Sequence, residues 1–342
     1  MADRSSEYTY RPAWWVPGPH MQTLWGRLAR PRERLELRSE RLRMSDGEEV
    51  ELQRMAAPRP SGGAPHLLFL HGLEGTVRSH YVPGLFDQAR RRGWSADLLL
   101  FRGCGAVPNL APRFYHSGET SDFDQVLRQV IAEAPARDVV LAGVSLGGNV
   151  LLKYLGERGA ELPPQVVAAA TLSVPYDLAR GARFLSRGFS RVYERHFLRT
   201  LRRKAFAKLE RIPGLFDGAA LARARTIWDF DDAVTAPVHG FRDASDYYER
   251  SSSLHFLHCI RVPTLLLSAY DDPFLPAAVL DDVRAEVARN ACVETEFVSH
   301  GGHVGFVSGR VPWRPLYYGE WRVVDFLEQT LTTVRDARHH DR

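Results

Sequence analysis

The chain has 342 residues, of which 44% are hydrophobic and 25% are charged. This composition is that of an ordinary globular protein and excludes an intrinsically disordered or collagen-like chain. The formal net charge of +4 is too small, in a chain of this length, to indicate nucleic-acid binding unless it is concentrated in one segment. The length allows two domains or one large α/β domain.

Three cysteines, Cys104, Cys259 and Cys292, are far apart in the sequence and odd in number. This pattern is typical of a reduced intracellular protein, and no cysteine pair has the spacing of a zinc site. The first 26 residues contain no apolar stretch of the length that a signal peptide needs. No later run approaches the ~18 apolar residues of a membrane span. We therefore expect a cytoplasmic protein.

The first segment, residues 1–31, combines three tryptophans with four prolines. We expect it to be neither helix nor strand and to pack as an arm across the core, anchored by its tryptophans. In residues 32–56 apolar side chains alternate around the turn signal Ser45-Asp46-Gly47, which predicts antiparallel strands. A looser stretch rich in proline and glycine follows at residues 58–65.

Short apolar runs then alternate with helical patterns. The runs cover residues 67–70, 96–101, 139–141, 166–172, 264–267 and 293–298, and helices are predicted at residues 81–92, 122–134, 146–156, 277–289 and 321–334. Strands that are covered on both faces have continuous apolar sequences, so this alternation predicts a mostly parallel sheet between two helical layers. The predicted fold class is therefore a doubly wound α/β domain.

One long interval interrupts this alternation. Helix-like sequence separates the apolar run at 166–172 from the next one at 264–267, which predicts an inserted helical cap or lid over residues 176–262. The α/β core is then expected to comprise residues 32–175 and 263–335, and residues 336–342 to form a disordered tail.

A nucleophile is predicted between the run at 139–141 and the following helix. The sequence there is Gly143-Val144-Ser145-Leu146-Gly147. A G-x-S-x-G motif between strand and helix is typical of a nucleophile elbow, in which small flanking residues permit a tight turn that exposes the serine hydroxyl. The bare motif is weak, and the strand and helix around it give it weight.

A serine hydroxyl needs a base, and the base needs an acid that orients it. In this architecture the acid and then the histidine follow the serine along the chain. Asp271 and Asp272 follow the run at 264–267, and His300 and His303 lie in a glycine-rich loop after the last run. We favour Asp272 for its spacing from the strand and His303 because it lies deeper in its loop; Asp271 and His300 are the alternatives.

An oxyanion formed at this serine needs preorganised donors, usually two backbone N–H groups. We predict the amide of Leu146, directly after the nucleophile, and the amide of Leu73, in the loop after the run at 67–70. His71, which opens that loop, is expected to be structural.

Several longer motifs accompany the elbow. They are Trp14-Trp15, Pro19-His20-Met21-Gln22-Thr23, His71-Gly72-Leu73-Glu74-Gly75, Phe101-Arg102-Gly103-Cys104, Tyr115-His116-Ser117-Gly118-Glu119-Thr120, Gly147-Gly148-Asn149, Phe230-Asp231-Asp232, Asp271-Asp272-Pro273-Phe274 and Gly301-Gly302-His303-Val304-Gly305-Phe306. On these motifs, which span nearly the whole chain, it resembles the YheT-like α/β-hydrolases (the AB hydrolase 4 group). That branch also contains embryogenesis-associated plant proteins and mammalian membrane-linked lipid hydrolases. The resemblance implies an α/β-hydrolase fold, a Ser-Asp-His triad and hydrolysis of medium-chain or lipid-like acyl esters.

The expected activity is therefore hydrolysis of carboxylic esters by Ser145, His303 and Asp272 through an acyl-enzyme, with no cofactor and no metal. Acyl transfer by the same triad is the nearest alternative. A non-catalytic binding protein on the same scaffold is a second alternative, although an intact triad argues against it. A haloalkane dehalogenase is disfavoured because its nucleophile would be a carboxylate. The substrate is expected to be a small or lipid-like ester.

Three other clusters have structural alternatives. His255, His258 and Cys259 resemble a metal site but lack further ligands, so a partly buried helix face is favoured. Asp229, Asp231 and Asp232 could bind a divalent ion but more often cap a helix or pair with arginines. Residues 116–120 resemble a helix start, with substrate contact as the alternative.

The positive charge is concentrated in residues 180–211, which contain nine arginines and two lysines against two glutamates. Apolar residues are interleaved with them, so the stretch is a basic amphipathic part of the predicted cap. It could contact anionic lipid or an acidic substrate at a membrane surface. The alternative is a solvated face over a cap core. The sequence leaves the oligomeric state open.

Overall fold

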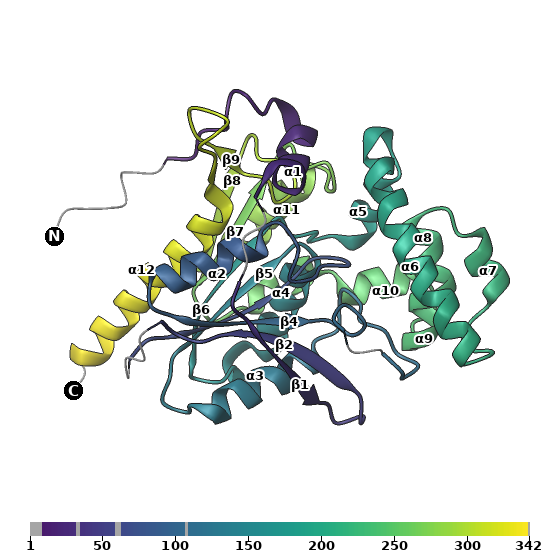
Figure 1. The fold of residues 1–342 in the computed structure, drawn as a ribbon, viewed down its shortest axis with the longest axis horizontal. Coiled ribbons are helices and arrows are strands. Elements are labelled where there is room, and N and C mark those ends of the chain that lie inside the picture. The colour runs from purple at the N-terminus through teal and green to yellow at the C-terminus, as the bar shows by residue number, and fades with distance from the viewer. Residues whose placement is uncertain (1–8, 32–34, 59–62, 107–108, 341–342) are drawn as a thin grey trace.

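An eight-stranded sheet forms the centre of the protein in this computed structural model, which describes residues 9–31, 35–58, 63–106 and 109–340 (Figure 1). Its strands are β1 (Arg38–Arg43), β2 (Glu49–Met55), β3 (His66–Leu70), β4 (Ser95–Leu100), β5 (Val139–Val144), β6 (Val166–Leu172), β7 (Thr264–Ala269) and β8 (Val293–Val298). Their order in the sheet is β1-β2-β4-β3-β5-β6-β7-β8. The pairs β1–β2 and β2–β4 are antiparallel, and every pair from β4–β3 to β7–β8 is parallel.

This sheet agrees with the sequence prediction. Strands β3 to β8 coincide with the six apolar runs, and β1 and β2 form the predicted antiparallel pair around a turn in which Gly47 has a positive φ of 86°. The predicted α/β fold class is confirmed. Residues 32–34 and 59–62, which belong to the predicted first strand region and to the proline- and glycine-rich stretch, lie outside the described residues.

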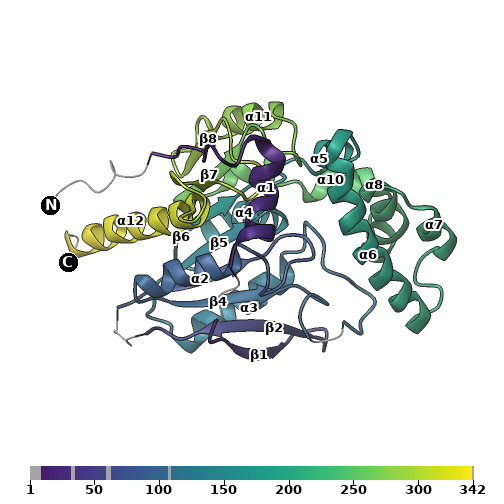
Figure 2. The same cartoon turned by 45° about the horizontal axis from the view of Figure 1, so that its top comes forward.

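Two helical layers cover the sheet (Figure 2). On one face α3 (Ser121–Glu133), α4 (Leu146–Arg158) and α11 (Ala278–Val287) bury their apolar side chains, and on the other face α2 (Val82–Arg91) and α12 (Tyr318–His340) do so. Each fully buried Leu, Val or Phe side chain contributes about 1.5–3 kcal/mol through removal of apolar surface from water. The two buried clusters therefore fix the strand ends at which the candidate site lies.

The prediction for residues 1–31 is wrong in one respect. Residues Gly18–Ala29 form a helix, α1, although the prolines indicated neither helix nor strand. Pro17 and Pro19 stand before and within its first turn, where the missing N–H would have no intrahelical partner and the fixed φ suits the helix. Before this helix, the Ala13 amide donates to the carbonyl of Val307 over 2.9 Å. Residues 1–8 lie outside the described residues.

The predicted disordered tail is also wrong as far as residue 340, because α12 continues to His340. Arg335 and Arg338 in its last turns both pair with the carboxylate of Asp138, at 2.9 and 2.8 Å, and so hold the end of the helix against the loop before β5. Residues 341–342 lie outside the described part of the chain.

The interval between β6 and β7 is helical, and we call it the β6–β7 helical segment. It contains α5 (Leu178–Leu185), η3 (Gly188–Ser190), α6 (Arg191–Arg211), α7 (Gly218–Arg223), α8 (Ile227–Phe230), η4 (Asp231–Thr235), α9 (Ala236–His239), α10 (Ala244–Ser251) and η5 (Ser253–Cys259). Its larger apolar cluster, which includes Leu198, Phe216 and Leu221, is separate from the two clusters against the sheet. Both views show α6, α7 and α8 together at one end of the molecule (Figures 1 and 2).

Two short elements complete the described structure. One is η2 (Gly159–Glu161), and the other is the pair β9 (Val307–Ser308) and β10 (Leu316–Tyr317), which is antiparallel. Across the described ranges, no helix has both the length and the apolar character needed to cross a bilayer.

Candidate active site

Ser145 occupies a sharp turn between β5 and α4. Its backbone has a positive φ of 54° and a ψ of −123°, a conformation that costs a residue with a side chain about 1–3 kcal/mol. The two flanking glycines permit this turn. A Cβ on Gly147 would lie 2.5 Å from the carbonyl oxygen of His71, and one on Gly143 would lie 2.6 Å from the Cα of Gly148. The G-x-S-x-G pattern is therefore required by the close approach of β5, α4 and the loop after β3.

The three predicted triad side chains lie in one hydrogen-bonded row. Ser145 Oγ is 3.0 Å from His303 Nε2, and His303 Nδ1 is 2.8 Å from Asp272 Oδ2. Asp272 also accepts a 2.7 Å hydrogen bond at Oδ1 from the amide of Phe274. Asp272 and His303 are 6% and 8% exposed, so their contact is largely shielded from water. This row can carry a proton from the serine hydroxyl to an imidazole that a carboxylate orients.

The two alternative residues lie in a different position. Asp271 Oδ1 accepts hydrogen bonds from the amides of Gly301 and Gly302, each at 2.9 Å. His300 is exposed and its Nδ1 is 3.3 Å from Asp271 Oδ2. Asp271 thus braces the loop that carries His303, and Asp272 is the acid that contacts the His303 ring.

Helix α1 also holds the loop that carries His303. The hydroxyl of Thr23 accepts a 2.9 Å hydrogen bond from the His303 amide and donates one of 2.7 Å to the carbonyl of Pro19. Gln22 accepts from the Val307 amide at 2.7 Å and donates to the Val307 carbonyl at 3.2 Å. Sequence reasoning missed both residues as parts of the site. The family motif at residues 19–23 was the available signal.

The two amides predicted as oxyanion donors belong to Leu146, directly after Ser145, and to Leu73, in the loop that lies against Ser145. Among the described residues, neither the Leu73 amide nor the Leu146 amide has a hydrogen-bond acceptor. Gly72 lies against the serine, because a Cβ added to it would be 3.1 Å from Ser145 Cβ. Both amides are therefore available beside Ser145 to donate to an oxygen.

Two tyrosine hydroxyls fix the backbone on either side of Leu73. The Gly72 amide donates to Tyr81 Oη at 2.8 Å, and the Glu74 amide donates to Tyr115 Oη at 2.9 Å. Burial raises the pKa of Tyr81 to about 12, so its hydroxyl stays neutral at physiological pH. Sequence reasoning did not predict this role for either tyrosine, although Tyr115 opens one of the motifs of the family resemblance; only the folded chain brings the two hydroxyls to the loop.

His71 supports the same loop from within. The Phe101 amide donates to His71 Nε2 at 3.1 Å, and Nδ1 therefore carries the proton that it donates to the Gly72 carbonyl at 2.7 Å. Burial lowers the pKa of His71 to about 4, so the ring is neutral and keeps this tautomer.

A cavity of about 1070 Å³ opens beside Ser145 and His303. Its walls are α1, the loop of residues 72–81, and η3 with the first half of α6. The ring of Phe274 stacks on the His303 ring with centroids 3.9 Å apart and also lines the cavity. Glu74 is the one acid that lines it among the described residues, and Lys204 of α6 pairs with Glu74 at 2.8 Å.

Comparison with known proteins identifies the family. The family model described as "alpha/beta hydrolase fold" matches residues 65–309. The chain is 38% identical to YheT of Escherichia coli, a protein named as an esterase, over 93% of this chain and 92% of YheT. This chain belongs to the α/β-hydrolase family. The predicted family, its YheT-like branch and the predicted hydrolase class are confirmed.

Two further relatives share less sequence identity with this chain. The mouse phospholipase ABHD3 is 29% identical over 90% of this chain and 76% of its own, and the yeast monoacylglycerol lipase is 30% identical over 72% and 56%. Among solved structures, the Pyrococcus furiosus esterase Pf2001 superposes with a TM-score of 0.57 at 16% identity, over 86% of this chain and 91% of that one. At that identity the likeness concerns the fold.

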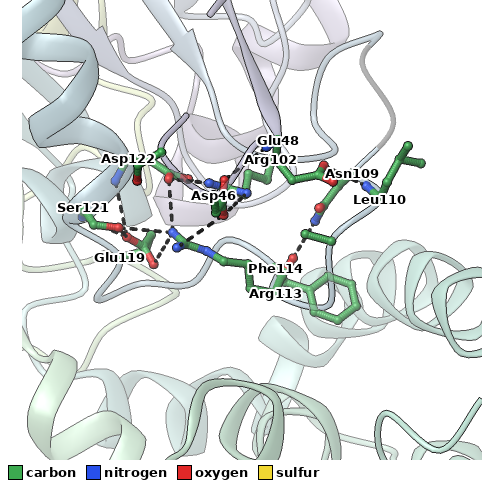
Figure 3. Close-up of polar contacts among 12 residues, drawn as sticks. Asp46, Glu48, Arg102, Asn109, Leu110, Arg113, Phe114, Glu119, Ser121 and Asp122 are labelled. Atoms are coloured by element: carbon green, nitrogen blue, oxygen red, sulfur yellow. Dashed lines mark hydrogen bonds and ion pairs between the residues drawn. The ribbon is translucent and has the colours of Figure 1, made fainter. Parts of the chain in front are cut away.

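Two of the motifs that carry the family resemblance, residues 101–104 and 115–120, supply Arg102 and Glu119 to one cluster of ion pairs (Figure 3). Arg102 is buried and donates two hydrogen bonds, of 2.5 and 2.7 Å, to Asp122 at the start of α3. It also pairs with Asp46 of the β1–β2 turn at 2.9 Å. Arg113 joins the same group through Glu119 at 2.9 Å. None of residues 116–120 lines the cavity, so these motifs tie loops and a helix start together.

The other candidate clusters have structural partners. Asp229 and Thr226 form a capping box at the start of α8, and Asp232 accepts from the Ala244 amide at 3.0 Å. Asp231 is buried and accepts from the hydroxyls of Thr235 and Tyr248, each at 2.6 Å. Burial raises the pKa of Asp231 to about 6.

In the cluster of His255, His258 and Cys259, the His258 ring pairs with a carboxylate, since His258 Nδ1 lies 2.8 Å from Glu286 Oε1. Within the described ranges, no three His, Cys, Asp or Glu side chains come together as a metal site would need.

Proposed function

We propose that this protein is a serine esterase that hydrolyses carboxylic esters through an acyl-enzyme. Ser145 is the nucleophile, His303 the general base and then general acid, and Asp272 the carboxylate that orients His303. The observation that carries this proposal is the row Ser145 Oγ–His303 Nε2 at 3.0 Å and His303 Nδ1–Asp272 Oδ2 at 2.8 Å beside a cavity. No cofactor or metal takes part in these steps.

The reaction proceeds in two halves. His303 removes the hydroxyl proton as Ser145 Oγ forms a bond to the ester carbonyl carbon, and the carbonyl electrons move onto its oxygen. The Leu73 and Leu146 amides donate to that oxyanion, an effect worth about 2.7–4 kcal/mol per donor in serine proteases. The alcohol then leaves with the proton from His303. A water molecule, deprotonated by His303, cleaves the acyl-enzyme and releases the acid.

The β6–β7 helical segment would act as the cap that shapes the acyl site. It contributes Phe189, Tyr193 and Phe197 to the cavity wall, opposite α1. These aromatic side chains suit an acyl chain, and relatives named esterase, phospholipase and monoacylglycerol lipase support an acyl ester as substrate. The proposed substrates are therefore short- to medium-chain or lipid-like acyl esters.

The first experiment compares p-nitrophenyl esters, from acetyl to dodecanoyl, with the wild-type protein and Ser145→Ala. We expect activity to fall by at least about 10⁴-fold in the variant, because the oxygen that forms the acyl bond is removed and only catalysis by the oxyanion donors and substrate binding remains. Ser79→Ala is a matched control, since Ser79 lines the same cavity but its hydroxyl accepts from the Thr76 amide. The control should keep at least half of the activity.

Labelling by a fluorophosphonate gives an independent measurement. The probe should modify wild type and Ser79→Ala, and it should leave Ser145→Ala unmodified. Circular dichroism checks that each variant is folded. Equal ester hydrolysis by wild type and a folded Ser145→Ala would refute the proposal.

A further inference from the structure

The mouth of the cavity has an exposed apolar rim. Leu28 of α1, Phe189 of η3 and Val192 of α6 all line the cavity, yet they are 75%, 51% and 51% exposed. They come from two elements that both line the cavity, α1 and the stretch formed by η3 and α6. Exposed apolar groups gathered at one site mark an interaction surface more often than scattered ones do.

A row of arginines runs along α6 beside this rim. Arg191, Arg195, Arg199 and Arg203 recur every four residues, and all four are exposed. Like charges at this spacing lie on neighbouring turns and destabilise an isolated helix. Within the described structure, none of the four side chains forms an ion pair or a hydrogen bond. The row therefore has a cost to the helix and no compensating partner inside the protein.

The acidic side chains near the arginine row already have other partners and do not neutralise its positive charge. Glu194, in the same stretch of α6, is buried and accepts from the Ser186 hydroxyl at 2.6 Å and the Ile227 amide at 3.0 Å. Glu74, at the cavity wall, is paired with Lys204. Arg78, exposed on the loop that forms another wall of the cavity, adds further positive charge at the mouth.

The arginine row and the cavity wall are adjacent faces of one helix. Val192, His196 and Thr200 line the cavity, and each directly follows an arginine of the row. Consecutive residues are ~100° apart around a helix, so the charged face borders the cavity along two turns. Contacts from α6 to α1, His196–Arg27 and Tyr193–His20, each of 3.2 Å, join the two walls.

We propose that this surface, the apolar rim (Leu28, Phe189, Val192) with the arginine row (Arg191, Arg195, Arg199, Arg203), docks on an anionic lipid surface. The arginines meet lipid phosphates while the rim enters the boundary of the acyl chains, as amphipathic helices do at membranes. An ester taken from the bilayer then enters the cavity directly; this step rests on the proposed function. Charge alone would also suit a nucleic acid, but the apolar rim has no counterpart there.

The test is co-sedimentation of the full chain with vesicles of phosphatidylcholine alone and with 30% phosphatidylglycerol, at low and high salt. The row variant replaces its four arginines by glutamine. The rim variant is Phe189→Ser with Val192→Ser. A control variant has the same net charge as the row variant but changes exposed arginines elsewhere. Its substitutions are Arg223→Gln, Arg225→Gln, Arg289→Gln and Arg310→Gln.

Wild type should bind anionic vesicles, and high salt should weaken this binding because screening shortens the reach of the charges. The row variant should lose at least about 100-fold in partition coefficient, as the loss of four basic side chains near an anionic surface implies. The rim variant should lose about tenfold, and the control should stay within about threefold. The row variant should hydrolyse p-nitrophenyl acetate at the wild-type rate.

Three results would overturn the docking proposal. The first is that wild type does not bind anionic vesicles. The second is that the row and control variants lose vesicle binding equally. The third is that the protein binds duplex DNA, but not vesicles, through the arginine row. Vesicle binding is measured without catalysis, so its outcome is separate from that of the Ser145→Ala experiment.

Discussion

Two acid–histidine pairs form between the same two loops, and they differ in almost every physical respect. Asp272 and His303 are buried, 2.8 Å apart, with the histidine stacked on Phe274 and directed to Ser145. Asp271 directly precedes Asp272 and His300 lies three residues before His303, but His300 is exposed and its Nδ1 lies 3.3 Å from Asp271 Oδ2. The pairing of residue types alone therefore carries no information about catalysis.

The difference lies in what each acid accepts. One carboxylate oxygen of Asp272 accepts a hydrogen bond from the Phe274 amide, and the other contacts the His303 ring. One carboxylate oxygen of Asp271 accepts hydrogen bonds from the amides of Gly301 and Gly302. One carboxylate thus faces a ring that can change its charge, and the other holds backbone that cannot. Substitution of each should separate orientation of the base from support of its loop.

Among substitutions at the two pairs and the groups that support them, the largest expected effect is that of Asp272→Asn. The asparagine keeps the volume but cannot stabilise the imidazolium and favours the wrong tautomer of His303, so kcat should fall about 10⁴-fold, as for the equivalent change in a serine protease. Steady-state kinetics with a p-nitrophenyl ester measures this loss. A fall of less than about tenfold in a folded variant would contradict the assignment of Asp272 over Asp271.

The second effect concerns the support of His303 from α1. Thr23→Val keeps the shape but removes the hydroxyl that accepts from the His303 amide. A small shift of the ring costs about 10–100-fold in rate, so kcat should fall by that factor with KM nearly unchanged. Thr23→Ser, which keeps the hydroxyl, should restore most of the rate. Equal kinetics for the valine and serine variants would remove Thr23 from the positioning of the base.

The sharp turn at Ser145 was predictable from the sequence because its constraints are local. Gly143 and Gly147 lie two residues on either side of Ser145, where a side chain would clash with neighbouring backbone. The motif itself therefore indicates the tight turn of the elbow. The strands were predictable for a similar reason, since burial on both faces makes each a continuous apolar run. Asp271 and Asp272 both follow the same strand, however. Which one faces the base depends on the amides of Gly301 and Gly302, about thirty residues further along the chain.

The contribution of α1 was hidden for a different reason. Prolines around residue 19 indicated an irregular arm, yet a proline in the first turn is compatible with a helix, and that helix carries Thr23. The aromatic wall of the cavity was equally hidden. The position of α6 opposite α1 follows from tertiary packing, which no local pattern in residues 189–200 specifies.

The contrast between buried and exposed histidines extends to stability. Burial lowers the pKa of His239 to about 4, below its ordinary value of 6.5, while it accepts from the Phe114 amide at 3.3 Å. Between pH 6.5 and 4 the unfolded chain binds a proton at this histidine that the folded chain does not. The neutral, buried ring therefore contributes its full share to the free energy of unfolding above pH 6.5, and this contribution is lost as the pH falls toward 4.

His239→Gln should therefore lessen the acid dependence of stability. The slope of unfolding free energy against pH should decrease by up to about 1.4 kcal/mol per pH unit in that window. Urea unfolding at pH 4.5, 5.5 and 7 measures the slope. An unchanged slope would mean that His239 has the same pKa in the folded and unfolded states, which contradicts the lowered pKa.

The smallest effects are expected at the exposed pair. His300→Asn removes a ring that is 65% exposed at its side chain and contacts no other part of the site, so kcat and stability should stay within about twofold and about 0.5 kcal/mol of wild type.

Asp271→Asn retains one oxygen for the amides of Gly301 and Gly302 but removes its charge, and charge-assisted hydrogen bonds are about twice as strong as neutral ones. Its kcat should therefore fall by only a few fold.

The measurement that sharpens the comparison is the double variant Asp271→Asn with His300→Asn. If its rate equals that of Asp271→Asn alone, the carboxylate acts on the loop and not through His300. A loss near that of Asp272→Asn would show that the exposed pair takes part in catalysis.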